Sequence, residues 1–159
     1  HPDSVIGLSN KRQWVYEKFG DHYQVDDDIL YMMRVYVPHL YHRKQKVEKH
    51  EARLILQYIY EVAVEAGCYL FGPGNKPNPV AYTGAEAFKF NHQISGGCLG
   101  IRKNPYFYFP KLDKYVGEDM FINLLSMFYF RKNLVDLRFS FAFYKTETGE
   151  GGNAEFRSE

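Results

Sequence analysis

Apolar residues recur at helical spacing in two short segments near the start of the chain. Residues 10–19 follow Ser9, whose side chain can cap a helix, and the glycine at the next position supplies a left-handed stop. Residues 29–35 follow three aspartates, whose carboxylates suit the positive end of a helix, and Pro38 ends the segment. Both segments are predicted to be helices. The side of the first helix that we expect to dock on the protein consists of Trp14, Val15 and Phe19.

The longest helical pattern covers residues 43–66 and ends at Gly67, a natural helix stop. Its first part is rich in charged residues, and its later part carries apolar side chains on two sides. A helix with this pattern is solvated in its first turns and buried in its last ones. At ~1.5 Å per residue it would be about 36 Å long. It is therefore expected to form the spine of the protein.

A different pattern follows a stretch rich in glycine and proline at residues 72–79, which is predicted to be an exposed loop. Residues 134–145 alternate apolar and polar side chains, which is typical of a half-buried strand. Helical spacing returns at residues 116–131, with acidic residues near the start and basic residues near the end. Four shorter segments are expected to be strands, and these are residues 80–83, 87–91, 98–102 and 106–110.

These elements predict an α+β fold in one domain that spans residues 1–159. A helical amino-terminal half, residues 1–67, is expected to pack on a small and mostly antiparallel sheet. The mixed half, residues 68–159, would supply that sheet and one further helix before the last long strand. Each half alone would bury too little surface to be stable, so the loop at 72–79 is not expected to separate two domains.

Composition narrows the class of protein. The chain has 159 residues, of which 13 are Phe, 14 are Tyr and 1 is Trp, so it is too aromatic to be disordered or collagen-like. Lys and Arg number 20 against 19 Asp and Glu, which leaves a formal net charge of +1. That balance is not the basic excess of a general nucleic-acid coat protein. The apolar stretches fall short of the ~18–20 residues that cross a membrane, so no membrane partner is expected.

The two cysteines, Cys68 and Cys98, show no metal-ligand spacing. They are interpreted as buried, reduced thiols, which favours the cytoplasm for a soluble protein, and a single disulfide is the alternative. Cys98 lies among glycines with His92 nearby, an arrangement that suits a nucleophilic thiol and its base. The competing interpretation is a tight strand turn with a buried thiol, so whether the protein is an enzyme stays open. Neither a cofactor nor a metal site is expected.

A basic segment covers residues 42–53. Four of its side chains fall near one side of the predicted helix, as a phosphate-binding face requires, and these are Arg43, Lys46, His50 and Arg53. Glu48 and Glu51 lie at ion-pair spacing within the same segment. A solvated helix face is therefore favoured over nucleic-acid binding, which is the third hypothesis for function.

Tyrosine is more abundant than a core of this size needs. The tyrosines that we expect to line a ligand or partner surface are Tyr82, Tyr106, Tyr108 and Tyr144. The leading hypothesis is a non-catalytic binding or assembly module that contacts a protein partner or its own copies through these tyrosines. The alternative is a small-molecule-binding enzyme or receptor with an aromatic cavity between helices and sheet.

Overall fold

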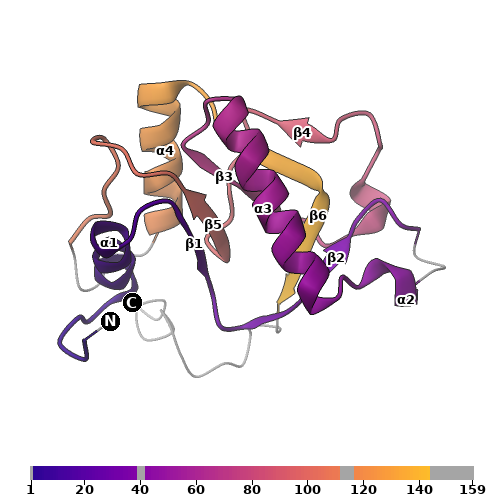
Figure 1. The fold of residues 1–159 in the computed structure, drawn as a ribbon, viewed down its shortest axis with the longest axis horizontal. Coiled ribbons are helices and arrows are strands. Elements are labelled where there is room, and N and C mark those ends of the chain that lie inside the picture. The colour runs from indigo at the N-terminus through magenta and orange to yellow at the C-terminus, as the bar shows by residue number, and fades with distance from the viewer. Residues whose placement is uncertain (1, 39–41, 112–116, 144–159) are drawn as a thin grey trace.

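The structure is a computed structural model that describes residues 2–38, 42–111 and 117–143 (Figure 1). The helices are α1 (Leu8–Lys18), α2 (His42–Gln45), α3 (Lys49–Glu65) and α4 (Glu118–Phe130), with a short 3-10 helix η2 (Pro79–Ala81). The strands are β1 (His22–Val25), β2 (Ile29–Arg34), β3 (Leu70–Gly74), β4 (Phe88–Lys89), β5 (Cys98–Ile101) and β6 (Leu134–Phe143).

The strands form one sheet in the order β1-β5-β3-β6-β2, and the short β4 also pairs with β6. The pairs are antiparallel except for β3 and β6, which run parallel. The α+β class is therefore confirmed, and the sheet is mostly antiparallel as predicted. However, β1 and β2 come from the first half of the chain, so the prediction of a helical amino-terminal half over residues 1–67 is wrong in that part.

Residues 29–34 form the strand β2, and not the helix that the sequence predicts, because they pair with the long strand β6. β2 pairs with β6 from Ile29 opposite Phe143 to Arg34 opposite Phe139. Met32 and Met33 are both buried, although neighbouring residues of a strand point to opposite faces. Short apolar runs of this length fit helix and strand spacing equally well. The long partner strand β6 therefore decides the conformation of the segment.

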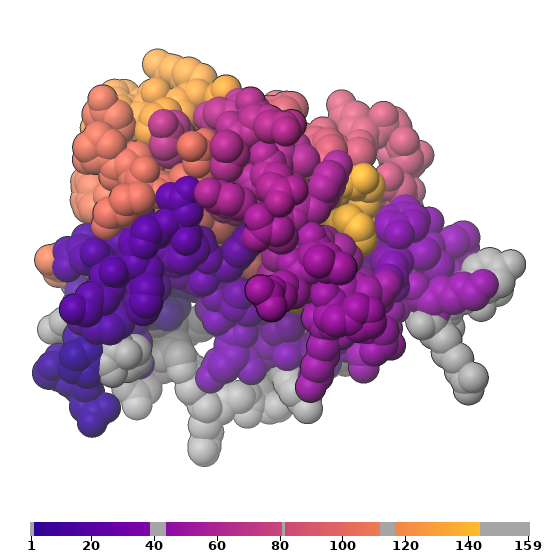
Figure 2. Space-filling view, in the orientation of Figure 1, coloured from indigo at the N-terminus to yellow at the C-terminus, as the bar shows by residue number. Residues whose placement is uncertain are grey.

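Helices cover both faces of the sheet. α3 lies across the front face in Figure 1, where Ile59 and Ala63 pack in one cluster with Phe71 and Leu134 of the sheet. On the other face, Ile122 of α4 joins a second cluster with residues of α1, β3, β5 and β6. Figure 2 shows α3 in magenta across the middle of the molecule and α4 in orange at its upper margin. One side of α4 is thus committed to the core.

The predicted loop at 72–79 is wrong in its first three residues, because β3 continues through Gly74 with all of its residues buried. A Cβ atom on Gly72 would lie 2.9 Å from the carbonyl oxygen of Cys98, closer than Cβ atoms approach backbone in proteins. Glycine is therefore needed here for a close approach of two strands, and not for a turn. Pro73 also stays in the ladder, opposite Asp136.

The predicted helix at 43–66 is interrupted between α2 and α3. The amide of Val47 donates to the carbonyl of Met32 at 2.9 Å, so the chain follows β2 for a few residues. The Glu51 carboxylate then accepts a hydrogen bond from the amide of Glu48 at 2.9 Å and helps to start α3. Tertiary pairing and a local cap together divide what the periodicity presents as one helix.

Two predicted strands are not strands. Residues 80–83 overlap η2, and residues 106–110 have no regular secondary structure. Asn104 shapes the start of the second segment, because its Oδ1 accepts hydrogen bonds from the amides of Tyr106 and Phe107, both at 3.0 Å. The other predicted elements of the second half are confirmed as β4, β5, α4 and β6.

Both faces of β6 are covered, although its alternation predicts one solvated face. Asp136 and Ser140 are fully buried on the face expected to be polar. The Asp136 carboxylate accepts two hydrogen bonds from the guanidinium of Arg138, at 3.0 and 2.7 Å. That guanidinium also lies over the ring of Phe88, 4.8 Å from its centroid. A paired and ring-stacked charge makes the burial of this carboxylate tolerable.

Candidate functional site

The outer side of α4 exposes a row of large apolar side chains. Met120, Leu124 and Phe128 are 58%, 67% and 64% exposed, and their spacing of four residues places them in one line along the helix. We call this row the α4 stripe. Ile122 and Ser126 are buried on the side that faces the sheet. A helix that is apolar on both sides needs a second partner for its outer side or leaves it in water.

Aromatic side chains widen the stripe. The ring of Tyr106 stacks on that of Tyr129 with centroids 4.5 Å apart, and the ring of Tyr108 meets Phe121 edge-on at 5.2 Å. The three tyrosines are each exposed by almost half. We call the stripe together with Tyr106, Tyr108 and Tyr129 the α4 face. Tyrosine, phenylalanine and methionine are the residue types that protein interfaces are enriched in.

The inner side of α4 is held firmly. The side-chain amide of Asn123 accepts a hydrogen bond from the amide of Ile94 and donates one to its carbonyl, both at 2.9 Å. The same side chain accepts from Asn133 at 2.9 Å. Arg131 ends the helix in a left-handed conformation, with φ 60°, and its amide donates to the carbonyl of Met127. The α4 face is therefore preorganised, so little motion would be lost when it binds.

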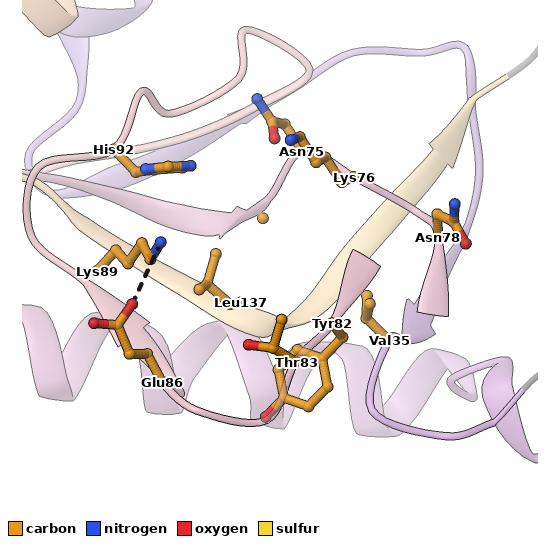
Figure 3. Close-up of a pocket in the computed structure, with 11 residues that line it drawn as sticks. Val35, Asn75, Lys76, Asn78, Tyr82, Thr83, Glu86, Lys89, His92 and Leu137 are labelled. Carbon is orange, nitrogen blue, oxygen red and sulfur yellow. Dashed lines mark ion pairs between the residues drawn. The ribbon is translucent and has the colours of Figure 1, made fainter. Parts of the chain in front are cut away.

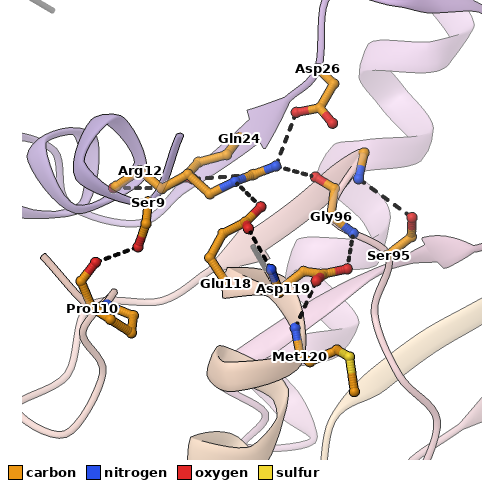
Figure 4. A network of polar contacts seen from close by, with 12 residues as sticks. Ser9, Arg12, Gln24, Asp26, Ser95, Gly96, Pro110, Glu118, Asp119 and Met120 are labelled. Carbon is orange, nitrogen blue, oxygen red and sulfur yellow. Dashed lines mark hydrogen bonds and ion pairs between the residues drawn. The ribbon is translucent and has the colours of Figure 1, made fainter. Parts of the chain in front are cut away.

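A buried arginine joins the start of α4 to α1 (Figure 4). Arg12 is 4% exposed, and its guanidinium lies 3.0 Å from Asp26 and 3.3 Å from Glu118. It also donates to the carbonyl of Gly96 at 2.9 Å. Burial raises the pKa of Asp26, and the charge of Arg12 opposes that rise. Each of these contacts connects two parts of the fold, so the cluster positions α4.

α1 docks by a polar side, and the predicted apolar stripe stays partly outside. Its buried residues are Ser9, Arg12, Gln13 and Tyr16. Phe19, predicted to dock, is 53% exposed just beyond the helix. Gln13 accepts from the amide of Phe109 at 2.6 Å, and the hydroxyl of Tyr16 donates to the carbonyl of Asn104 at 2.7 Å. These hydrogen bonds hold the irregular segment that carries the two exposed tyrosines of the α4 face.

Cys98 and His92 lie in different surroundings. Cys98 is buried in one cluster with Met32 and Phe141, and burial raises the pKa of its thiol. His92 lies instead on the wall of a surface cleft. A buried thiol with a raised pKa is a poor nucleophile. The geometry therefore favours the interpretation of Cys98 as a buried core thiol, and Cys68 is likewise buried and free.

The basic residues do not share one helix face, because the break before α3 separates them. Lys46 lies in the link between α2 and α3, whereas His50 and Arg53 lie in the first turns of α3. The side chain of Arg43 lies outside the described residues. A continuous phosphate-binding face along one helix is thus not formed by the described part of residues 42–53.

The predicted surface tyrosines separate in space. Tyr106 and Tyr108 belong to the α4 face. Tyr82 lines the same cleft as His92, and Tyr144 lies outside the described residues. The described tyrosines of this set therefore mark two different surfaces, the α4 face and the cleft lined by Tyr82.

The α4 stripe is what sequence reasoning missed. Helical spacing places Met120, Leu124 and Phe128 in the predicted helix at residues 116–131 and gives them no surface role. The available signal was an excess of apolar residues, since α4 is apolar on more than one side and the sheet covers only one of them. Periodicity alone does not tell which of two apolar sides faces the sheet.

No protein-family model matches the chain, and neither does any curated protein or solved structure. The helices in the described ranges include none that is long and apolar enough to cross a membrane. Within the same ranges, His, Cys, Asp and Glu side chains do not gather in groups of three or more that could hold a metal ion.

Proposed function

We propose that this protein is a non-catalytic binding and assembly module that pairs with a second copy of itself through the α4 face. The observation that carries the proposal is the α4 stripe, whose three large apolar side chains are each more than half exposed on a helix anchored by its other side. Contiguous exposed apolar residues mark interaction sites. The flanking tyrosines add large, rigid rings that cost little conformational entropy on binding.

The charges of α4 favour a second copy in antiparallel orientation. Asp119 lies in the first turn, and Arg131 ends the helix. A two-fold axis at Leu124 would place Met120 of one copy against Phe128 of the other and bring each Arg131 near the first turn of its partner. The dipoles of the two antiparallel helices would also point in opposite directions, which is the favourable arrangement for neighbouring dipoles. The surface is thus complementary to itself, as a two-fold pair requires.

The packing of two such helices follows from the spacing of the stripe. Side chains four residues apart form a ridge that fits the groove of an identical helix, with axes about 8–10 Å apart. Tyr106 and Tyr108, which contact α4 through Tyr129 and Phe121, would flank the ridge and shield it from water. Two of the four predicted tyrosines, Tyr106 and Tyr108, would therefore form the border of the interface around the apolar centre that the α4 stripe supplies.

Light scattering after size exclusion tests the pairing. The wild-type protein is expected to elute with the mass of a dimer at micromolar concentration. Leu124→Gln is expected to shift the protein to monomer, because the variant places two amides at the two-fold axis. Leu54→Gln is the matched control, since Leu54 is 65% exposed on α3, and it should leave the dimer intact.

Three outcomes would overturn the proposal. The first is a wild-type protein that stays monomeric up to about 1 mM, an affinity too weak for specific assembly. The second is an equal loss of dimer in the Leu124→Gln and Leu54→Gln variants. The third is a monomer that dimerises only after removal of residues 144–159, which would make the chain's own tail the occupant of the α4 face.

A further inference from the structure

A cleft of about 230 Å³ with both polar and apolar walls opens where β3 ends at Gly74. Figure 3 shows Lys89 and His92 along one side of it, Asn75 and Lys76 along another, and Leu137 of β6 between them. The lining therefore combines long basic side chains and amide groups with an apolar floor. This differs from the aromatic cavity between helices and sheet that the sequence offers as an alternative.

The backbone around the cleft is shaped in advance. The pairing of β3 with β6 shifts register between Pro73 and Gly74, and Gly74 lies so close to β6 that an added Cβ would be 3.3 Å from the carbonyl oxygen of Phe139. Such bulges redirect a strand and are frequent beside binding sites. Asn78 then accepts from the amide of Val80 at 3.0 Å, which turns the chain back.

The side chains of Lys89 and His92, on one wall of the cleft, project from backbone that is held in place by the sheet and by Asn133. Lys89 lies opposite Val135 in the pairing of β4 with β6. Asn133 holds the next residues, because its side chain donates to the carbonyl of His92 at 3.3 Å and its amide to that of Phe90 at 2.7 Å. Side chains on an anchored backbone lose less freedom when they bind a ligand.

The cleft holds more cationic than anionic groups. The ammonium groups of Lys76 and Lys89 face a single carboxylate among the lining residues, that of Glu86, and the imidazole of His92 lies on the same wall as Lys89. Glu86 lies 3.3 Å from Lys89, but its side chain is 59% exposed, and exposed ion pairs of this kind contribute little. An anion that binds inside the cleft can therefore replace the Glu86 carboxylate as the partner of Lys89. The ring of Tyr82 supplies apolar surface beside these charges.

We propose that this cleft binds a small organic anion. Its carboxylate or phosphate group would replace Glu86 beside Lys89 and His92, and its apolar part would lie against Leu137 and Tyr82. Sites for drug-sized ligands occupy roughly 300–1,000 Å³, so the smaller volume of this cleft selects a compact ligand. The inference does not depend on the pairing through the α4 stripe, because none of these side chains belongs to the stripe.

Nuclear magnetic resonance of the nitrogen-15-labelled protein tests the site. Phenyl phosphate and benzoate are the probes, and benzyl alcohol is the uncharged control. We expect saturable amide shifts at residues 75, 76, 89 and 92 with at least one anion, and the stronger of the two identifies the phosphate or the carboxylate as the preferred group. The proposal is overturned by shifts that do not saturate with either anion, or that benzyl alcohol produces equally.

Charge variants separate a local site from a general attraction. Glu86→Gln is expected to tighten binding of the preferred anion about threefold, and Lys89→Met to weaken it about fivefold. Glu65→Gln and Lys18→Met make the same changes of charge at exposed positions on α3 and α1 and should leave the affinity unchanged. Equal effects in the control variants would show that only net charge matters and would overturn the proposal.

Discussion

Arg12 and Glu118 form a buried ion pair between α1 and the first turn of α4, with nitrogen and oxygen 3.3 Å apart and side chains 5% and 6% exposed. The pair joins two residues that lie more than a hundred positions apart in the sequence. It also fixes the end of the helix that carries the proposed docking surface. The orientation of α4 therefore depends on a charged contact as well as on its apolar inner side.

Replacing Arg12 with methionine is expected to destabilise the protein by about 3–5 kcal/mol, because the carboxylates of Asp26 and Glu118 would lose their buried cation. Urea denaturation at neutral pH measures the free energy of unfolding. Lys18→Met, which removes a charge at the exposed end of α1, should change it little. If Arg12→Met lowered the free energy of unfolding by less than about 1 kcal/mol, the cluster would contribute no more than a surface ion pair and the prediction would be wrong.

The stability of the protein should depend on pH through Asp26. Burial raises the pKa of this carboxyl in the folded protein, so the folded state binds more protons than the unfolded state between the two pKa values. The penalty for the ionised form is therefore full at neutral pH and fades as the pH falls through the raised pKa. As the pH falls from about 7 to about 4, the free energy of unfolding of the wild type should therefore rise relative to that of Asp26→Asn.

Urea titrations of both proteins across that range measure the difference. The comparison isolates Asp26, because the remaining carboxyls are common to the two proteins. A difference that is flat in pH, or that shrinks on acidification, would contradict the assignment of this shift to the buried side chain of Asp26.

Gly72→Ala is expected to cost about 1–3 kcal/mol of stability, because the new methyl would meet the backbone of Cys98 at 2.9 Å in the middle of the sheet. Gly20→Ala is the control, since a Cβ at that position meets nothing within 4 Å. Thermal denaturation compares the two. If Gly72→Ala melted at the wild-type temperature, the close approach of β3 and β5 would not be a requirement of the fold.

The thiol of Cys98 is expected to resist alkylation by iodoacetamide in the folded protein. Burial shields the sulfur and raises the pKa of the Cys98 thiol, and the thiolate is the reactive form. Peptide mapping by mass spectrometry before and after unfolding in urea gives the extent of labelling. If native Cys98 were labelled at the rate of an exposed cysteine, the interpretation of Cys98 as a shielded core thiol would be wrong.

Arg131→Glu should weaken the proposed dimer about tenfold, since two symmetry-related attractions to Asp119 become repulsions. Sedimentation velocity at low and high salt measures the dissociation constant. The wild-type dimer is expected to weaken with salt, and the variant to weaken less or to recover. Arg131→Gly keeps the left-handed helix end and should show a smaller loss. Unchanged association of Arg131→Glu would exclude the antiparallel arrangement.

The candidate site was only partly accessible to sequence reasoning. The tyrosine excess correctly indicated Tyr106 and Tyr108 as exposed side chains, although they lie on an irregular segment and not on a strand. Sequence reasoning assigned the stripe beside them no surface role, because Leu124 and Leu125 look alike in a periodic pattern. Leu125 is partly buried and Leu124 is exposed because of the rotation of α4 about its axis, and two hydrogen bonds between the Asn123 side chain and the backbone of Ile94 fix that rotation.

Local sequence was sufficient to predict α1, α4, β5 and β6, because helical and alternating patterns are visible within each of these short segments. It was also sufficient for the α+β class and for the abundance of exposed aromatic rings. The three-dimensional packing decided everything that depends on distant partners. Residues 29–34 form a strand because they pair with β6. Gly72 lies in a close approach to β5 and not in a turn. Arg12 fixes the start of α4 through its ion pair with Glu118. Pairing energy between distant segments exceeds weak local preference, so tertiary structure alone determined which apolar side of α4 remains exposed.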